Sequence, residues 1–279
     1  MTRGRAATDI WDARAARAGT QWDRVRRKAS VNAVHDLRVA LRRLEEVTRL
    51  FAPLLPDRAA RRLRRRSRSI RWRLGPVRSA DVVAELLAEV ERSAPRVLKT
   101  SARRLRRGAL ERAQGLRDGH GIALAELAHR VERVRRKIPH DGAALRRCAA
   151  RGLAARVAEA VKARRASARG AKDALHDLRI AARRIRYALE AIAEMGCTGT
   201  RGAIARARTL QAHLGRLRDE ELLRAWVLRS GPPAVDPALR SFLRLRVEKA
   251  RRVAQNAAAG FRPEKDLVRV SRALGQDQQ

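Results

Sequence analysis

The sequence is poor in cysteine and in aromatic residues, and each shortage excludes a class of protein. Cys148 and Cys197 are the only cysteines. Two thiols are too few for the disulfide framework of a small secreted domain or for a cysteine zinc site. Aromatic residues make up 3% of the chain, so we expect no aromatic platform on which single-stranded nucleic acid could stack. The four tryptophans are predicted to fill core or interface positions: Trp11, Trp22, Trp72 and Trp226.

Acidic residues and long apolar segments are also scarce. Asp and Glu number 29 against 66 Lys and Arg, which gives a net charge of +37 and a pI near 11.9. Self-repulsion of this size destabilises a compact chain unless counterions or a polyanion screen it, so a polyanionic partner is predicted. The first residues lead into no apolar segment, and no stretch approaches about 18 apolar residues without a charge. We therefore expect a soluble cytoplasmic protein with no membrane segment.

No strand alternation or hairpin signal is present, and an all-α fold is predicted. At 279 residues and 45% hydrophobic content, the chain can bury a substantial core. Between the Gly and Pro breakers, apolar residues recur at intervals of three and four, which is typical of helices. The predicted helices cover about 8–28, 31–51, 57–74, 79–92, 95–117, 122–137, 143–167, 172–195, 203–214, 237–259 and 263–274, with a further helix starting after Gly215. Ser30 or Asn32 is the predicted cap of 31–51, and Asp236 that of 237–259.

Two sequence blocks occur twice, in the same order. Residues 35–43 read His-Asp-Leu-Arg-Val-Ala-Leu-Arg-Arg, and residues 176–184 read His-Asp-Leu-Arg-Ile-Ala-Ala-Arg-Arg, 141 positions later (176 − 35). A second block, residues 74–81, aligns with 214–221 at an offset of 140 (214 − 74), and both copies share Leu-Gly and a later Arg. The pair of blocks predicts an internal duplication into halves 1–140 and 141–279, with the boundary near residues 139–142.

On a helix, each copy of the first block has one apolar and one cationic side. The apolar side is predicted to face the core through Leu37, Leu41, Leu44, Val47 and Phe51 in the first copy and Leu178, Ile185, Leu189 and Ile192 in the second. We call the opposite sides the first stripe (His35, Arg38, Arg42, Glu46, Arg49) and the second stripe (His176, Arg179, Arg183, Tyr187, Glu190). A merely solvated face needs charge, but it does not need histidine and arginines at the same offsets twice. We therefore predict that the stripes bind an anion.

The two blocks together resemble the CHAD family, whose name abbreviates conserved histidine α-helical domain. The resemblance covers about residues 5–275. It implies two pseudo-symmetric helical bundles that form one CHAD domain, with the stripes lining a central basic groove or pore that binds inorganic polyphosphate. It also implies an association with polyphosphate granules. One departure concerns the Arg-Asp pair of the second block, which is Arg218-Asp219 in the second half but Arg78-Ser79 in the first.

We accordingly predict a non-catalytic polyphosphate-binding protein without cofactor or metal. An arginine fork offers bidentate donors to phosphate oxygens, and a protonated histidine adds another donor. The predicted primary contacts are His35, Arg38, Arg42 and Arg43 with His176, Arg179, Arg183 and Arg184. Arg78 and Arg218 are predicted to support them from the start of the following helix, where anions are favoured. Arg68 and Arg208 are secondary candidates.

Two other functions are compatible with parts of the sequence. Metal-dependent phosphohydrolases use His-Asp doublets, but with a further upstream His, and the arginines around both doublets would repel a divalent cation. The remaining histidines (His120, His129, His140 and His213) show no metal-ligand spacing. Non-specific nucleic-acid binding at low salt fits the charge, although no groove-reading motif is present. A scaffold role is compatible with polyphosphate binding, but no motif in the sequence indicates which protein would be bound.

Overall fold

The fold is all α-helical, as the periodicity predicted. It is seen in a computed structural model of the chain, which describes residues 7–118, 130–134, 142–230 and 236–276. The helices are α1 (Ala7–Arg27), α2 (Val31–Leu50), α3 (Asp57–Arg73), α4 (Gly75–Ser93), α5 (Arg96–Asp118), α7 (Gly142–Ala168), α8 (Ala174–Glu194), α9 (Thr200–Ser230), α10 (Pro237–Gly260) and α11 (Pro263–Gln276), with a short 3-10 helix at Ala52–Leu54. Within these ranges there is no β-strand. Most of the predicted helix 122–137 and of the predicted boundary at 139–142 lies outside the described residues.

Two helix starts are capped by residues that the sequence indicated. The Ser30 side chain accepts a hydrogen bond from the Ala33 amide at 3.3 Å and caps α2. Asp236 accepts from the Ala238 amide at 2.8 Å and caps α10, whose first residue is Pro237. Each cap satisfies an amide that has no partner inside its helix.

The predicted break at Leu214-Gly215 is wrong. In the first half, Pro76 lies at the start of α4 and the chain is interrupted between α3 and α4. Its counterpart in the second half is Arg216, which has a backbone N–H, and a glycine inside a helix costs only about 1 kcal/mol. As a result, α9 runs without interruption over 31 residues. Arg78 lies in the first turn of α4, whereas Arg218 lies in the middle of α9.

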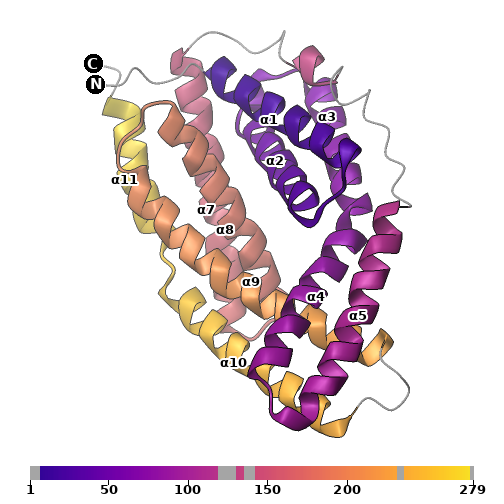
Figure 1. The fold of residues 1–279 in the computed structure, drawn as a ribbon. Coiled ribbons are helices and arrows are strands. Elements are labelled where there is room, and N and C mark those ends of the chain that lie inside the picture. Colours follow the sequence, from indigo (N-terminus) through magenta and orange to yellow (C-terminus); the bar gives the residue numbers. More distant parts are fainter. Residues whose placement is uncertain (1–6, 119–129, 135–141, 231–235, 277–279) are drawn as a thin grey trace.

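The helices that carry equivalent blocks contact each other across the two halves. Within the first half, α1 and α3 pack on α2, and α5 packs on α4; within the second, α7 and α9 pack on α8, and α10 packs on α9 (Figure 1). Between the halves, α2 packs on α8, and α4 packs on α9. The two copies of the first block are therefore neighbours in space, and so are the helices with the two copies of the second block.

The hydrophobic core consists of two clusters, and each contains residues from both halves of the sequence. The larger lies among α1, α2, α3, the start of α4, α7, α8, the first part of α9, the second part of α10 and α11. The smaller joins α4 and α5 to the last part of α9 and to α10. All the apolar residues predicted to face inward from α2 and α8 are buried. No described helix is long and apolar enough to cross a membrane.

Three of the four tryptophans pack against the core, and the fourth is exposed. Trp11 is fully buried and its indole N–H donates to Thr48 Oγ1 at 3.4 Å. Trp22 and Trp226 are partly buried against the two core clusters. Trp72 is 78% exposed and is not part of the core. It shares the outer face of α3 with Arg65 and Arg68, because the inner face is already occupied by Leu63 and Ile70.

Candidate functional site

The two stripes meet between α2 and α8. The charge of Arg42 on α2 acts on Arg183 of α8, and Arg42 in turn is acted on by Arg179. Arg38 and Arg71 join the same group, since Arg71 lowers the pKa of both Arg38 and Arg42. We call these residues the central cluster: Arg38, Arg42, Arg71, Arg179 and Arg183. It draws on α2, α3 and α8, and hence on both halves of the chain.

The central cluster holds like charges in a partly desolvated place. Burial, followed by the charges of Arg42 and Arg71, lowers the pKa of Arg38 to about 9. Burial and the charges of Arg42 and Arg179 lower the pKa of Arg183 to about 9. The pKa of Arg42 falls to about 10, first through burial and then through Arg71. All three guanidinium groups remain protonated at neutral pH. The cluster therefore keeps its positive charge, although burial and the neighbouring arginines destabilise the charged forms.

Only part of this charge is balanced by the protein. Arg71 forms a bidentate pair with Glu45, at 2.9 and 2.8 Å, and its carbonyl oxygen accepts a hydrogen bond from Arg38. Arg42 Nε is buried and has no hydrogen-bond partner among the described residues. Around Arg42 and Arg183, no described carboxylate lies within ion-pair distance. Arg38 likewise forms no ion pair with a described carboxylate, so the unbalanced charge of the central cluster lies on Arg38, Arg42 and Arg183.

The C-terminal part of the second stripe closes one side of the central cluster. Tyr187 is buried, with the guanidinium groups of Arg186 and Arg43 at 4.7 and 5.6 Å from its ring centroid. Arg43 also pairs with Glu190 at 3.2 Å. Arg43, a predicted primary contact, is thus held by a carboxylate and an aromatic ring of the opposite half.

At the end of the stripes that carries the histidines, charged groups of the two halves lie close to one another. His35 is exposed, and partial desolvation with the charge of Arg78 lowers its pKa, against an opposing effect of Asp36. Burial raises the pKa of Asp219, while Arg179 and Arg78 act to lower it. Asp219 is thus placed between an arginine of the first half and one of the second.

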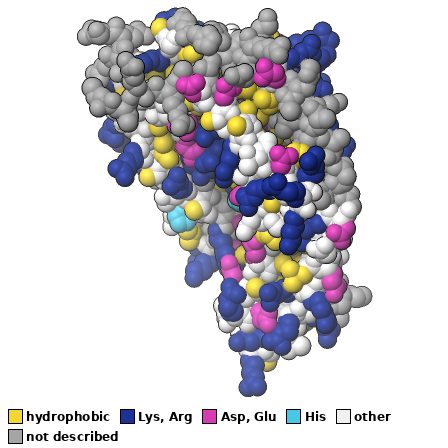
Figure 2. All heavy atoms as spheres, turned by 45° about the horizontal axis from the view of Figure 1, so that its top comes forward, with side chains coloured by type: hydrophobic (Ala, Val, Ile, Leu, Met, Phe, Trp, Pro, Cys, Tyr) yellow, Lys and Arg dark blue, Asp and Glu magenta, His cyan; other side chains and the backbone are white. Residues whose placement is uncertain are grey.

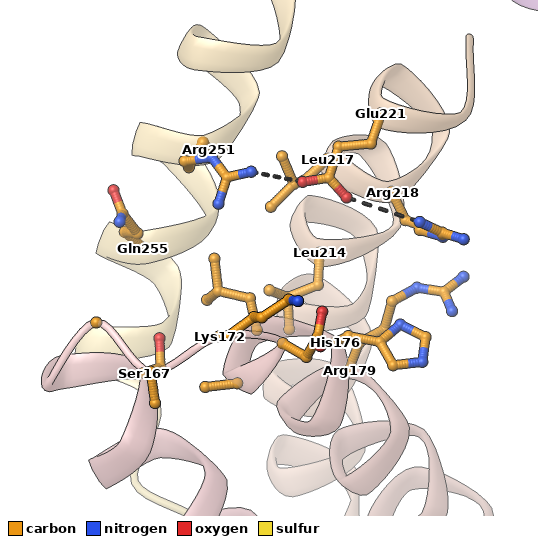
Figure 3. Close-up of a pocket in the computed structure, with 15 residues that line it drawn as sticks. Ser167, Lys172, His176, Arg179, Leu214, Leu217, Arg218, Glu221, Arg251 and Gln255 are labelled. Atoms are coloured by element: carbon orange, nitrogen blue, oxygen red, sulfur yellow. Dashed lines mark hydrogen bonds and ion pairs between the residues drawn. The ribbon is translucent and has the colours of Figure 1, made fainter. Parts of the chain in front are cut away.

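A pocket of ≈ 280 Å³ continues this end of the site in the second half (Figure 3). His176 and Arg179 of α8 and Arg218 of α9 point toward one another along one wall. The opposite side includes Lys172, which precedes α8, and Arg251 of α10, which pairs with Glu221 at 2.6 Å. His176 is exposed rather than packed in hydrocarbon.

A sequence model of the CHAD domain matches residues 9–228. The chain belongs to the CHAD domain family. Two solved structures share its fold. PptA from Streptomyces chartreusis is 18% identical, with a TM-score of 0.61 over 90% of this chain and 97% of that one. The CHAD domain from the plant Ricinus communis is 20% identical, with a TM-score of 0.58 over 99% of this chain and 93% of that one. Among curated proteins, no sequence matches this chain.

In this CHAD domain, most of the predicted site residues come together, but four do not. The residues that gather along the facing stripes are His35, Arg38, Arg42, Arg78, His176, Arg179, Arg183 and Arg218. Arg43 is engaged as described above, and Arg184 pairs with Glu159 of α7 at 2.8 Å. Arg208 is exposed on α9. Arg68 is exposed on α3 and lines a separate recess with Arg49.

Some residues of the site were not predicted, and Arg71 is the most important of them. Its counterpart at an offset of 140 is Gln211, which donates to the carbonyl oxygen of Ala182 at 3.1 Å. Because the two halves differ here, the repeated blocks did not point to Arg71. Lys172 had a usable signal in the sequence, since it is a basic residue only four positions before His176.

Metal-binding groups are not found in the described part of this CHAD domain. No three His, Cys, Asp or Glu side chains gather there in a way that could hold a metal ion. His120, His129 and His140 lie outside the described residues. On the face in Figure 2, Lys and Arg side chains predominate, with Asp and Glu dispersed among them (Figure 2).

Proposed function

We propose that this CHAD domain binds inorganic polyphosphate between its two stripes and does not catalyse its hydrolysis. The observation that carries the proposal is the central cluster, in which partly desolvated arginines of both halves lie together without enough carboxylates to balance them. A row of phosphates would supply the missing negative charge. Each guanidinium group can donate two hydrogen bonds to phosphate oxygens.

The spacing of the arginines favours a polymer over a single phosphate ion. Arg38 and Arg42 lie one turn apart on α2, and Arg179 and Arg183 repeat this spacing on α8. Successive turns of a helix are about 5 Å apart. Several phosphates of one extended chain could therefore be contacted from both sides. Because the fold already holds these arginines together, little ordering of side chains would oppose binding.

Nucleic acid shares the phosphate chemistry but fits this place less well. The arginines of the central cluster are half-buried between α2 and α8, where a slender chain without bases is more easily accommodated than a duplex. The aromatic residue of the site, Tyr187, is buried under Arg43 and Arg186 and offers no free face for a base. The total charge would still give weak DNA binding at low salt.

The decisive experiment reverses the charge of one arginine from each half. We expect Arg42→Glu combined with Arg183→Glu to lower the affinity for long-chain polyphosphate by at least roughly a hundredfold, because two close phosphate contacts become repulsive. Binding is measured by titration calorimetry, and helicity by circular dichroism. The matched control is Arg107→Glu with Arg244→Glu, two exposed arginines without a described ion-pair partner, which should have only a small effect.

Equal losses in both double variants would refute a specific site. Long-chain polyphosphate should also displace bound DNA at moderate salt, while excess DNA should not displace polyphosphate. Release of phosphate in the presence of Mg²⁺ or Mn²⁺ would contradict the non-catalytic part of the proposal. In cells, binding of this kind would bring the protein to polyphosphate granules, and the double charge reversal should disperse a fluorescently tagged protein from them.

A further inference from the structure

A second concentration of arginine lies on α3, outside the central cluster. Five arginines line a recess of ≈ 400 Å³ between the end of α2 and the outer side of α3. We call it the arginine recess; it consists of Arg49, Arg61, Arg64, Arg65 and Arg68. Arg61 pairs with Asp57. The other four have no ion pair with any described carboxylate.

The composition of α3 is not that of an ordinary solvated helix. Nine of its 17 residues are arginine, and Asp57 is its only acid. The pairs Arg61–Arg65 and Arg64–Arg68 have the (i, i+4) spacing at which like charges destabilise a helix by about 0.2–0.5 kcal/mol each. A face that only needs to be soluble would be more stable with acids among the arginines. The arrangement instead favours the binding of an external anion at the surface of α3.

In the second half, three of the five recess positions carry no arginine, while the counterparts of Arg61 and Arg68 are Arg201 and Arg208. The counterpart of Arg49 is Glu190, which pairs with Arg43 at 3.2 Å. The counterparts of Arg64 and Arg65 are Ile204 and Ala205 of α9. The recess is therefore a property of one half, and it does not follow from the duplicated blocks.

The arginine recess continues the first stripe. Arg49 belongs both to the stripe and to the recess, and it follows Arg42 by two turns of α2, about 10 Å along the helix axis. Burial and the charge of Arg184 lower the pKa of Arg49, so this residue also adjoins the second half. The acids of α2 between the two places, Glu45 and Glu46, are both already paired, with Arg71 and Arg156. Positive charge thus extends without a free carboxylate from the central cluster to α3.

We propose that the arginine recess binds the part of a polyphosphate chain that extends beyond the central cluster, on the first half only. This inference rests on the proposed function. It adds the direction in which the polyphosphate chain leaves the central cluster and a dependence of affinity on chain length. A chain short enough to be held by the central cluster does not reach the recess. A longer chain leaves the cluster along α2 and gains further phosphate contacts on α3.

The test compares a short and a long ligand on the full chain. The recess variant is Arg64→Gln with Arg65→Gln, and the matched control is Arg104→Gln with Arg107→Gln, two exposed arginines of α5. Tripolyphosphate and long-chain polyphosphate are titrated at several salt concentrations. We expect the recess variant to bind the long chain roughly fivefold more weakly and to bind tripolyphosphate unchanged. The slope of log affinity against log salt for the long chain should become shallower by about 1.4 units, because two phosphate contacts are lost and each removes about 0.7.

Three outcomes would overturn this inference. The first is an equal loss for both ligands, and the second is an equal loss in the α5 control. The third is a loss confined to single-stranded DNA, which would assign the recess to nucleic acid. Failure of the proposed function gives a different pattern: Arg42→Glu with Arg183→Glu would then leave the binding of tripolyphosphate intact. Since glutamine relieves repulsion within α3, the recess variant should remain folded, and circular dichroism verifies this.

Discussion

The first-block helices α2 and α8 are much more alike than the second-block helices α4 and α9. Arg42 and Arg183 occupy equivalent positions and lie in the same cluster, each with a strongly lowered pKa. By contrast, α4 begins with Gly75 and Pro76, whereas α9 passes through the equivalent residues without a break. Arg78 therefore has the free amides of a helix start nearby, and Arg218 does not.

The same contrast extends to the acids beside these arginines. The second half has Asp219 next to Arg179, while the first half has Ser79 in its place. Both halves do pair the later acid of the block with an arginine of the following helix: Asp81 with Arg117, and Glu221 with Arg251. The two halves thus share this ion pair, whereas only the second half has a carboxylate next in sequence to the arginine that both copies of the second block share.

The largest effect is expected from introducing into α9 the proline that interrupts the helix at the equivalent position of the first half. Arg216→Pro should lower the free energy of unfolding by about 3 kcal/mol or more, because proline removes an amide and clashes with the preceding turn inside α9. Chemical denaturation measures the change. Arg216→Ala is the control, since it removes the pairs with Glu89 and Glu220 (2.6 and 2.7 Å) but keeps the amide. If the proline variant were as stable as the alanine variant, α9 would not be continuous at this point.

A smaller effect tests whether α2 and α8 are equivalent. Arg42→Met and Arg183→Met should each raise the free energy of unfolding without ligand by about 1 kcal/mol, because a partly buried, unbalanced charge is replaced by an apolar chain of similar length. In a protein of this size the melting temperature should rise by roughly 2–4 °C. Both variants should bind polyphosphate more weakly. A rise for one and a fall for the other would show that the two arginines have different structural roles.

The smallest effect concerns the acid that distinguishes the halves. Ser79→Asp should weaken polyphosphate binding and Asp219→Asn should strengthen it, each by about threefold, since one partly exposed charge near the ligand is worth less than about 1 kcal/mol. Calorimetric titration at fixed salt gives both values. Glu111→Gln, at an exposed position of α5, supplies the effect of removing a remote carboxylate. If Asp219→Asn does not exceed this control, Asp219 does not face the ligand.

Features encoded by neighbours in the sequence were predictable. Ser30 and Asp236 cap their helices as expected, because a cap depends on only three or four consecutive residues. The buried sides of α2 and α8 followed from the 3.6-residue period. The continuity of α9 was not predicted because Gly215 was interpreted as the end of a helix. In the first copy of the block it is Pro76, not the glycine, that prevents a continuous helix.

Features that depend on which helices become neighbours were not predictable in the same way. Helical phase placed Glu46 on the polar side of α2, but it is 4% exposed and pairs with Arg156 of α7 at 2.7 Å. Arg71 enters the central cluster because α3 crosses α2 beside Glu45. No local pattern marks such an encounter, since it depends on how the helices pack.

The sequence by itself determined the all-α class, the two kinds of face on α2 and α8, and the excess of positive charge, because periodicity and composition are properties of the chain alone. Only the tertiary structure decided that Arg42 and Arg183 share one partly desolvated place and that Arg43 and Arg184 are held by carboxylates. The physical reason is that the charge of an arginine is fixed by its chemistry, whereas its free energy depends on which charges and how much water the packing of distant helices leaves around it.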